Sequence, residues 1–121
     1  MAKSSKRTTL MAPTSYTVAI TLTDQTDPNG PNNFNYAPGF LQVHRGDNVK
    51  FKCNRPFTIT FLYGTPFGNV SEFFSTIMDR ASDVGTIDPN AAFQAYHYTV
   101  SATDPDGKIH VDGSCPTLVV G

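Results

Sequence analysis

The sequence predicts an all-β sandwich of about seven short strands, and three observations support this prediction. Apolar residues alternate with polar ones along several segments, most clearly over residues 16–23 (YTVAITLT), as in strands with one buried face. Nine Gly and nine Pro are spread along the chain, and they favour turns between short strands. A length of 121 residues suits a single hydrophobic core.

The first half of the chain supplies four of the expected strands. After the strand over 16–23, the segment from Asp24 to Pro38 is rich in Asp, Asn, Gly and Pro and is expected to be a long connection. Two alternating runs, Phe40 to His44 and Asn48 to Cys53, flank a tight turn at 45–47. They predict either a hairpin or a corner between two sheets. A further alternating run, from Phe57 to Phe61, predicts the fourth strand.

The second half begins with a different pattern. In VSEFFSTIMDRAS, over residues 70–82, apolar side chains recur at helical spacing behind Ser71 as a cap, which predicts one short helix covering an end of the sandwich. Alternation returns with Tyr96, Tyr98 and Val100 on one face of a strand. A DPDG turn over 104–107 precedes two final strands, over 108–111 and 117–120.

The distribution of charged and apolar residues along the chain indicates its domain organisation and its cellular location. Residues 1–14 contain Lys3, Lys6 and Arg7 without an acid, which predicts a disordered basic leader before one domain over 15–121. The alternative is a basic tail that touches an anionic partner. The start lacks the apolar run of a secretory signal, and no stretch suits a membrane span, so we expect a cytoplasmic protein with no membrane partner.

The remaining composition argues against several other classes. The formal net charge is −1, so no strong positive field attracts nucleic acid, and we expect no nucleic-acid partner. The cysteines are Cys53 and Cys115, without a CxxC spacing. We expect two reduced, buried thiols, and the alternative is one disulfide in an oxidising compartment.

Three segments resemble the cupredoxin family. FLQVHRGDNVKF, over 40–51 and followed by Asn54, is similar to the family's pattern of strand, Gly-Asp turn and strand before an Asn. PFTITF, over 56–61, stands where cupredoxins carry His-x-Val-x-Phe. YHYTV, over 96–100, with the later PTLVVG resembles the family's Tyr-x-Phe-x-Cys strand, ligand loop and closing strand. The resemblance implies a Greek-key β-sandwich with Phe51, Ile59, Phe61, Tyr98 and Val100 between its sheets.

The same resemblance implies a copper-free member of bacterial type. A blue-copper site needs two imidazoles and one thiolate, usually with a weak axial Met. The family pattern would place the first His at Phe57 and the Cys at Val100, and neither residue can coordinate copper. The loop after Val100, SATDPDGK, contains no His and no Met. We therefore expect no cofactor and no blue copper centre.

No other catalytic or metal-binding pattern stands out. His44, His97 and His110 lack a ligand spacing and are expected to be solvated surface residues, although His110 with Cys53 and Cys115 forms an alternative displaced metal site. No nucleophile elbow is present, and the Asp residues at 24, 27, 104, 106 and 112 are in turn contexts. Neither DPNGPNN nor DPDG has the register of a calcium loop. We expect the chain not to be an enzyme.

These inferences favour a non-catalytic protein-interaction or assembly module. The expected partner is a protein or a second copy, since open sandwiches present edge strands and loop tips to partners. The alternative function is a metal-binding or redox protein with a non-standard site. The candidate partner-binding residues are all aromatic and are expected in loops or at strand edges. Core packing is the alternative role for each. They are Phe34, Tyr36, Phe67, Phe73 and Phe74.

Overall fold

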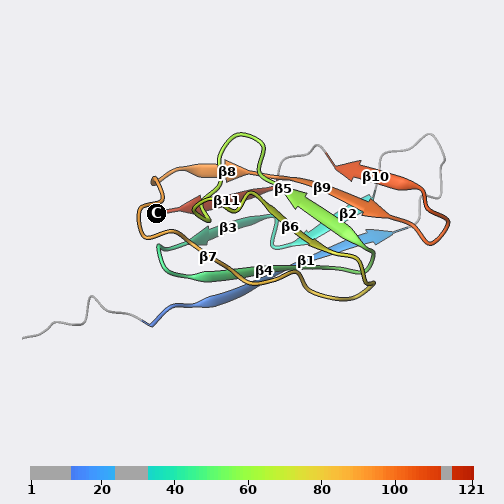
Figure 1. Ribbon diagram of the computed structural model, residues 1–121, viewed down its shortest axis with the longest axis horizontal. Helices are drawn as coiled ribbons and strands as arrows, with labels where there is room; N and C mark the ends of the chain where they lie inside the picture. The colour runs from blue at the N-terminus through green and yellow to red at the C-terminus, as the bar shows by residue number, and fades with distance from the viewer. Residues whose placement is uncertain (1–11, 24–32, 113–115) are drawn as a thin grey trace, which may run out of the picture.

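The computed structural model describes residues 12–23, 33–112 and 116–121, which form an all-β sandwich (Figure 1). No helix occurs in these ranges, and therefore none that could cross a membrane. The eleven strand segments are β1 (Ser15–Thr23), β2 (Asn33–Ala37), β3 (Phe40–Val43), β4 (Asn48–Cys53), β5 (Phe57–Thr60), β6 (Glu72–Ser75), β7 (Gly85–Thr86), β8 (Ala95–His97), β9 (Thr99–Thr103), β10 (Ile109–Asp112) and β11 (Thr117–Val120).

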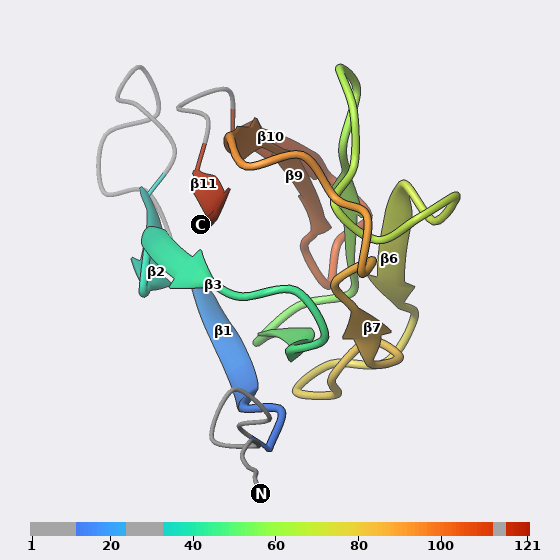
Figure 2. The same ribbon diagram turned by 90° about the vertical axis from the view of Figure 1, so that its left-hand side faces the viewer.

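The strands form two main sheets and a smaller third one. The first sheet has the order β2-β1-β4-β7, the second β10-β9-β5-β6, and the third β3-β11-β8. Seen from the end in Figure 2, β1, β2 and β3 lie across the core from β9, β10 and β6. The two main sheets therefore form the layers, and each has one edge strand on either side of the sandwich.

The centre of the first sheet is the long strand β1, whose alternating sequence gives it one buried face. Val18, Ile20 and Leu22 are buried and their neighbours are exposed, as predicted. β1 pairs in parallel with β4 and antiparallel with β2. The side chain of Asn54 extends the pairing beyond β4, because its amide accepts from Leu22 N and donates to Leu22 O, both at 2.9 Å.

The segment between β3 and β4 is a corner between sheets rather than a hairpin. β3 pairs with β11, whereas β4 pairs with β1 and β7. The predicted turn is present, since Asp47 N donates to His44 O at 3.0 Å. The buried carboxylate of Asp47 accepts from the backbone N–H groups of His44 and Thr14, at 2.8 and 3.0 Å. This carboxylate therefore anchors the start of β1 to the corner.

The core contains the five residues that were predicted to lie between the sheets. Phe51, Ile59, Phe61, Tyr98 and Val100 are all buried, and the register sets Ile59 opposite Val100. Five rings form one cluster between the sheets, with neighbouring centroids 4.7 to 6.5 Å apart. These rings belong to Phe51, Phe61, Phe67, Phe73 and Tyr98.

Two predicted elements are wrong. The expected helix over 70–82 is absent, and Glu72–Ser75 is the edge strand β6. Phe73 points into the core and Phe74 is exposed, so the adjacent pair follows the two-residue period of a strand, and tertiary packing overrides the helical spacing. The expected connection from Asp24 to Pro38 contains β2, which pairs with β1. Residues 24–32 lie outside the described ranges.

Two further expectations fall partly outside the described residues. Residues 1–11 of the predicted leader are not described, whereas residues 12–14 are exposed and Thr14 is hydrogen-bonded to Asp47. Cys53 is buried, as expected for a structural thiol. Cys115 lies outside the described ranges, so the predicted state of the two cysteines stays a prediction.

The orientation of β1 can be tested with two adjacent substitutions. Val18→Asp should abolish cooperative folding, because an unpaired carboxylate between the sheets costs several kcal/mol against a stability of about 5–15 kcal/mol. Ala19→Asp places the same side chain on the exposed face and should change the free energy of unfolding by less than about 1 kcal/mol. Circular dichroism during urea denaturation measures both. Wild-type stability of the Val18→Asp variant would contradict the assigned buried face.

Candidate functional site

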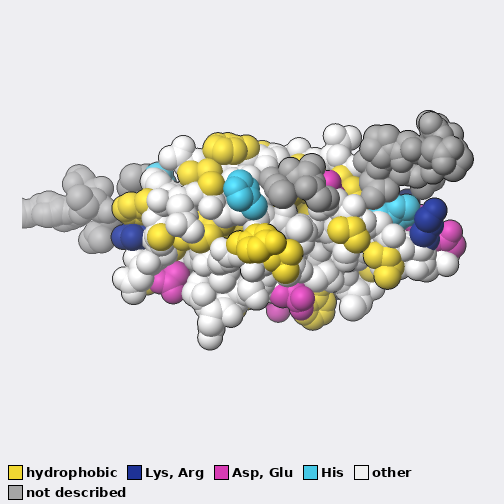
Figure 3. Space-filling view, turned by 90° about the horizontal axis from the view of Figure 1, so that it is seen from above, with side chains coloured by type: hydrophobic (Ala, Val, Ile, Leu, Met, Phe, Trp, Pro, Cys, Tyr) yellow, Lys and Arg dark blue, Asp and Glu magenta, His cyan; other side chains and the backbone are white. Residues whose placement is uncertain are grey.

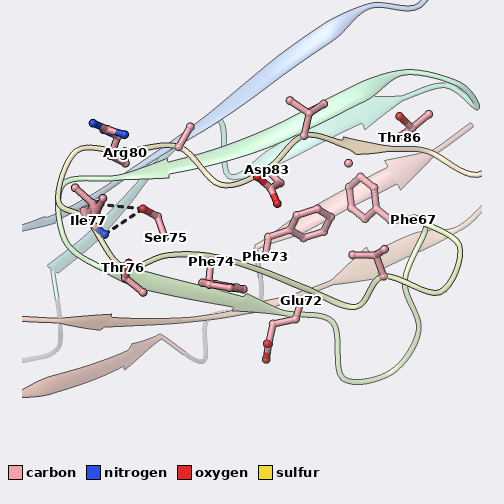
Figure 4. A pocket seen from close by; sticks show the side chains of 14 residues that line it. Phe67, Glu72, Phe73, Phe74, Ser75, Thr76, Ile77, Arg80, Asp83 and Thr86 are labelled. Atoms are coloured by element: carbon pink, nitrogen blue, oxygen red, sulfur yellow. Dashed lines mark hydrogen bonds between the residues drawn. The ribbon is translucent and has the colours of Figure 1, made fainter.

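A groove of about 640 Å³ opens between the edge strands β6 and β7, on one side of the sandwich. Figure 4 shows β6 along one wall and the segment that leads into β7 along the other. The lining residues all come from one continuous stretch of the chain, residues 67–86, which supplies both walls: Phe67, Val70, Glu72, Phe73, Phe74, Ser75, Thr76, Ile77, Arg80, Ala81, Asp83, Val84, Gly85 and Thr86.

The floor of the groove is aromatic and belongs to the core. Phe67 and Phe73 are only 5% and 4% exposed, and their rings meet edge to face with centroids 4.7 Å apart. Gly85 of β7 lies directly against them. A Cβ atom at Gly85 would be 2.6 Å from Phe73 Cζ and 2.7 Å from Phe67 Cδ1, closer than any such contact in a packed protein. The two edges can approach to this depth only because residue 85 has no side chain.

The rim carries exposed apolar side chains and a few charges. Phe74 is 57% exposed and Val84 is 59% exposed, and Val70 and Ile77 are also exposed. Asp83 points into the groove in Figure 4. Neighbouring exposed apolar side chains are typical of binding surfaces, so the groove combines an apolar rim with an acidic group.

Both walls of the groove present free strand edges. β6 pairs only with β5, and β7 pairs only with β4, among the described residues. In an antiparallel pair, every second residue directs its backbone N–H and C=O away from the partner strand. The groove therefore offers unpaired backbone groups beside apolar surface, which suits an extended polypeptide.

Three of the five candidate residues meet at this groove. Phe67 and Phe73 form the floor, where they are core residues rather than the exposed contacts that were expected, and Phe74 lies at the rim. Phe34 and Tyr36 lie elsewhere, on β2 at the opposite edge of the first sheet, with ring centroids 6.4 Å apart. The structure therefore does not gather the five rings into one patch.

The opposite side of the sandwich is joined by a hydrogen bond. The phenol of Tyr36 on β2 donates to the carboxylate of Asp112 on β10, so the two edge strands on that side are linked. Burial, with this hydrogen bond, raises the pKa of Tyr36 well above its ordinary value. Asp112 is thus a strand residue that accepts a side-chain hydrogen bond, not the turn residue that was expected.

Other exposed apolar side chains are spread over the remaining surface. Figure 3 shows separate apolar groups on one face of the molecule, with few charges between them. Ile109 and Val111 are exposed on β10, and neither lines the groove. The β6–β7 side is therefore distinguished by the depth of its groove rather than by apolar exposure alone.

The second wall of the groove has no signal in the sequence. This wall contains the charge of Asp83, the exposed apolar side chain of Val84 and the close approach at Gly85. The three residues form no recognisable sequence motif. Their role depends on β7 meeting β6 across the core, and only the three-dimensional structure shows this meeting.

The positions that the cupredoxin resemblance assigns to copper ligands are part of the core. Phe57 and Val100 are buried on the neighbouring strands β5 and β9. Burial raises the pKa of the Cys53 thiol, which favours the neutral thiol over the thiolate that binds metals or attacks substrates. Among the described residues, no three His, Cys, Asp or Glu side chains are grouped as metal ligands.

The structure contradicts the prediction for one of the three histidines. The His110 side chain is only 11% exposed, and its Nε2 donates to Asp104 Oδ2 at 2.6 Å, so it is not a solvated surface residue. Asp104 also lies 3.5 Å from Arg55 Nε. His44 and His97 are exposed, with Nδ1 2.6 Å from Gly121 O and 2.8 Å from Thr117 Oγ1, respectively. The Asp104–His110 pair ties β10 to the end of β9.

The close approach at Gly85 predicts a specific loss of stability. Gly85→Ala should lower the free energy of unfolding by about 1–3 kcal/mol, because the new methyl group overlaps the two rings. The loss should be smaller in a Phe73→Leu background, where one of the two overlapping rings is absent and only the Phe67 ring remains. Gly39→Ala is the control, since its Cβ would lie 3.5 Å from Tyr36 Cβ without overlap. Urea denaturation measures all four variants, and equal losses at Gly85 in both backgrounds would contradict the packing.

The Asp104–His110 pair predicts a pH dependence. The hydrogen bond from His110, aided by Arg55, lowers the pKa of Asp104 below its ordinary value of 3.8. Because the folded-state pKa is the lower one, the stabilisation is present above the unfolded-state pKa and is lost as the pH falls through the folded-state pKa. The stability difference between wild type and Asp104→Asn should therefore shrink below about pH 4. Asp106→Asn, in the same turn, is the control. A pH-independent difference would refute the pairing.

A comparison of this chain with known protein families and with curated proteins finds no match. The resemblance to cupredoxins therefore stays an expectation from the sequence. The groove, its free strand edges and the charges around it are the features of the molecule that bear on its function.

Proposed function

We propose that this protein is a non-catalytic assembly module that associates through the groove between β6 and β7. The observation that carries the proposal is the pair of free strand edges on either side of an apolar groove. Free edges promote pairing with another chain unless they are short, charged or covered. A groove with an aromatic floor adds apolar contact to such pairing.

We further propose that the module has a copper-free cupredoxin-like Greek-key fold. The support is the sequence pattern over 40–61 and 96–100, together with apolar residues at the assigned ligand positions 57 and 100. On this proposal, the aromatic and aliphatic side chains that replace the copper ligands contribute to core packing. The non-catalytic assignment is supported by the neutral state that burial favours for the Cys53 thiol.

Assembly can be measured with two matched substitutions in exposed apolar positions. Val84→Lys places a charge on the groove rim, and Ile109→Lys places the same charge on β10, at the other edge of the second sheet. Light scattering over a concentration series should give a mass above that of the monomer for wild type and for Ile109→Lys. Val84→Lys should shift toward the monomer, because a Lys ammonium is poorly accommodated in a buried apolar contact.

Two results would contradict the proposal. One is a wild-type chain that stays monomeric over the whole concentration range. The other is equal association of the Val84→Lys and Ile109→Lys variants, which would mean that the groove is not the interface.

A further inference from the structure

We propose that the groove binds residues 1–11 (MAKSSKRTTLM) of a second copy of this chain, which adds a strand to the free edge of β6. This inference rests on the proposed assembly function and names the segment that occupies the groove. Four observations carry it: the shape of the groove, the composition of the segment, the charges of both, and the direction in which the chain leaves β1.

The shape of the groove suits one extended segment. Residues 72–75 of β6 have no backbone hydrogen-bond partner apart from β5 in the described part of the chain. A strand laid along the groove would pair with these groups and would place alternate side chains over the Phe67 and Phe73 rings. Four residues of strand extend about 13 Å, so a short segment covers the whole edge.

Composition selects the segment among those outside the described ranges. Residues 24–32 (DQTDPNGPN) contain two Pro, which donate no backbone hydrogen bond, and two Asp. Residues 113–115 are too few to cover β6. Residues 1–11 contain no Pro, Gly or acid, and they end in Thr8, Thr9, Leu10 and Met11, which can form an edge strand with apolar anchors.

The charges of the segment and of the rest of the chain are opposite. Lys3, Lys6 and Arg7 give residues 1–11 a side-chain charge of +3. Residues 12–121 carry six of the nine Lys and Arg and all ten Asp and Glu, so their formal net charge is −4. Glu72 and Asp83 lie on opposite walls of the groove, with Arg80 as the basic residue of its lining. The acidic domain therefore favours a basic ligand over an acidic one.

The groove extends from the start of β1 toward its end. The register aligns Ser15 with Asn48, and Asn48 with Thr86 at one end of the groove. Further along, Ala19 is level with Lys52, and Lys52 is bridged to Ala81 of the groove. The groove thus runs parallel to β1, with β4 between them, whereas residues 12–14 lead away from Ser15 in the opposite direction.

Hydrogen bonds fix the direction in which residues 12–14 lead away from β1. Thr14 N donates to Asp47 Oδ1 at 3.0 Å, and Thr14 O accepts from Asn48 N at 2.9 Å, so both backbone groups are fixed. Ala12 precedes Pro13, which disfavours the helical conformation and favours an extended one. Binding in the chain's own groove needs a complete reversal before Ala12, whereas binding in a second copy needs none. Eleven extended residues span about 36 Å, enough to reach a neighbouring copy and cover its β6.

A charge-swap experiment on the full-length chain tests the proposal. One variant carries Asp83→Lys in the groove, and the other carries Lys6→Glu and Arg7→Glu in the segment. Each variant alone should raise the dissociation constant of self-association by about fivefold or more, as expected for exposed ion pairs. An equimolar mixture should recover wild-type association, because each altered groove then meets a segment of opposite charge. Sedimentation velocity measures the three samples, and Asp106→Lys is the control for an added charge outside the groove.

The outcomes separate this inference from the proposed function. If the segment variant associates like wild type while Val84→Lys does not, the groove is an interface but a different segment occupies it. If both charge variants are weakened and the mixture shows no recovery, pairing between copies is refuted, as it would be for a segment bound in its own groove. If the wild-type chain is monomeric at every concentration, both the proposed occupant of the groove and the proposed assembly function are refuted.

Discussion

Five aromatic rings pack between the two main sheets and set how closely the two layers can approach. Phe51 of β4 meets Phe73 of β6 and Tyr98 at ring-centroid distances of 5.4 Å each, so the rings join the two sheets directly. Such large side chains hold the layers apart at the usual sheet spacing of about 10 Å. Gly85 lets β7 rest against this cluster without closing the edge of the sandwich. The groove is therefore a consequence of core packing rather than a separate feature.

The two sides of the sandwich differ in a way that bears on function. On one side, Tyr36 and Asp112 connect β2 to β10, and Asp104 and His110 join β10 to the end of β9. On the other side, β6 and β7 have no comparable side-chain link in the described residues, and the aromatic floor is reached through the groove. The β6–β7 side thus combines two edge strands with an open apolar groove. This asymmetry supports the proposed assembly module.

The sequence predicted the class of fold and much of its core, because period-two alternation reports burial directly. Val18, Ile20, Tyr98 and Val100 face the core as their alternation indicated. The predicted helix is wrong because the pair Phe73 and Phe74 is compatible with both the helical period and the two-residue period of a strand. The packing of Phe73 against Phe67 and Gly85 selects the strand. The groove itself could not be predicted, since Asp83 and Val84 acquire their roles when β7 meets β6. The pairing of His110 with Asp104 depends in the same way on a turn that brings the two side chains together.

Strand addition at β6 is tested most directly by amide hydrogen exchange at those of residues 72–75 whose N–H groups point away from β5. These amides should exchange slowly when the wild-type chain is concentrated enough to assemble. They should exchange faster in dilute wild type and in the Lys6→Glu, Arg7→Glu variant, because the free edge of β6 is then uncovered. Exchange on β1, which is paired on both sides, serves as the internal reference. Equal protection of β6 in assembled and unassembled chains would contradict strand addition at this edge.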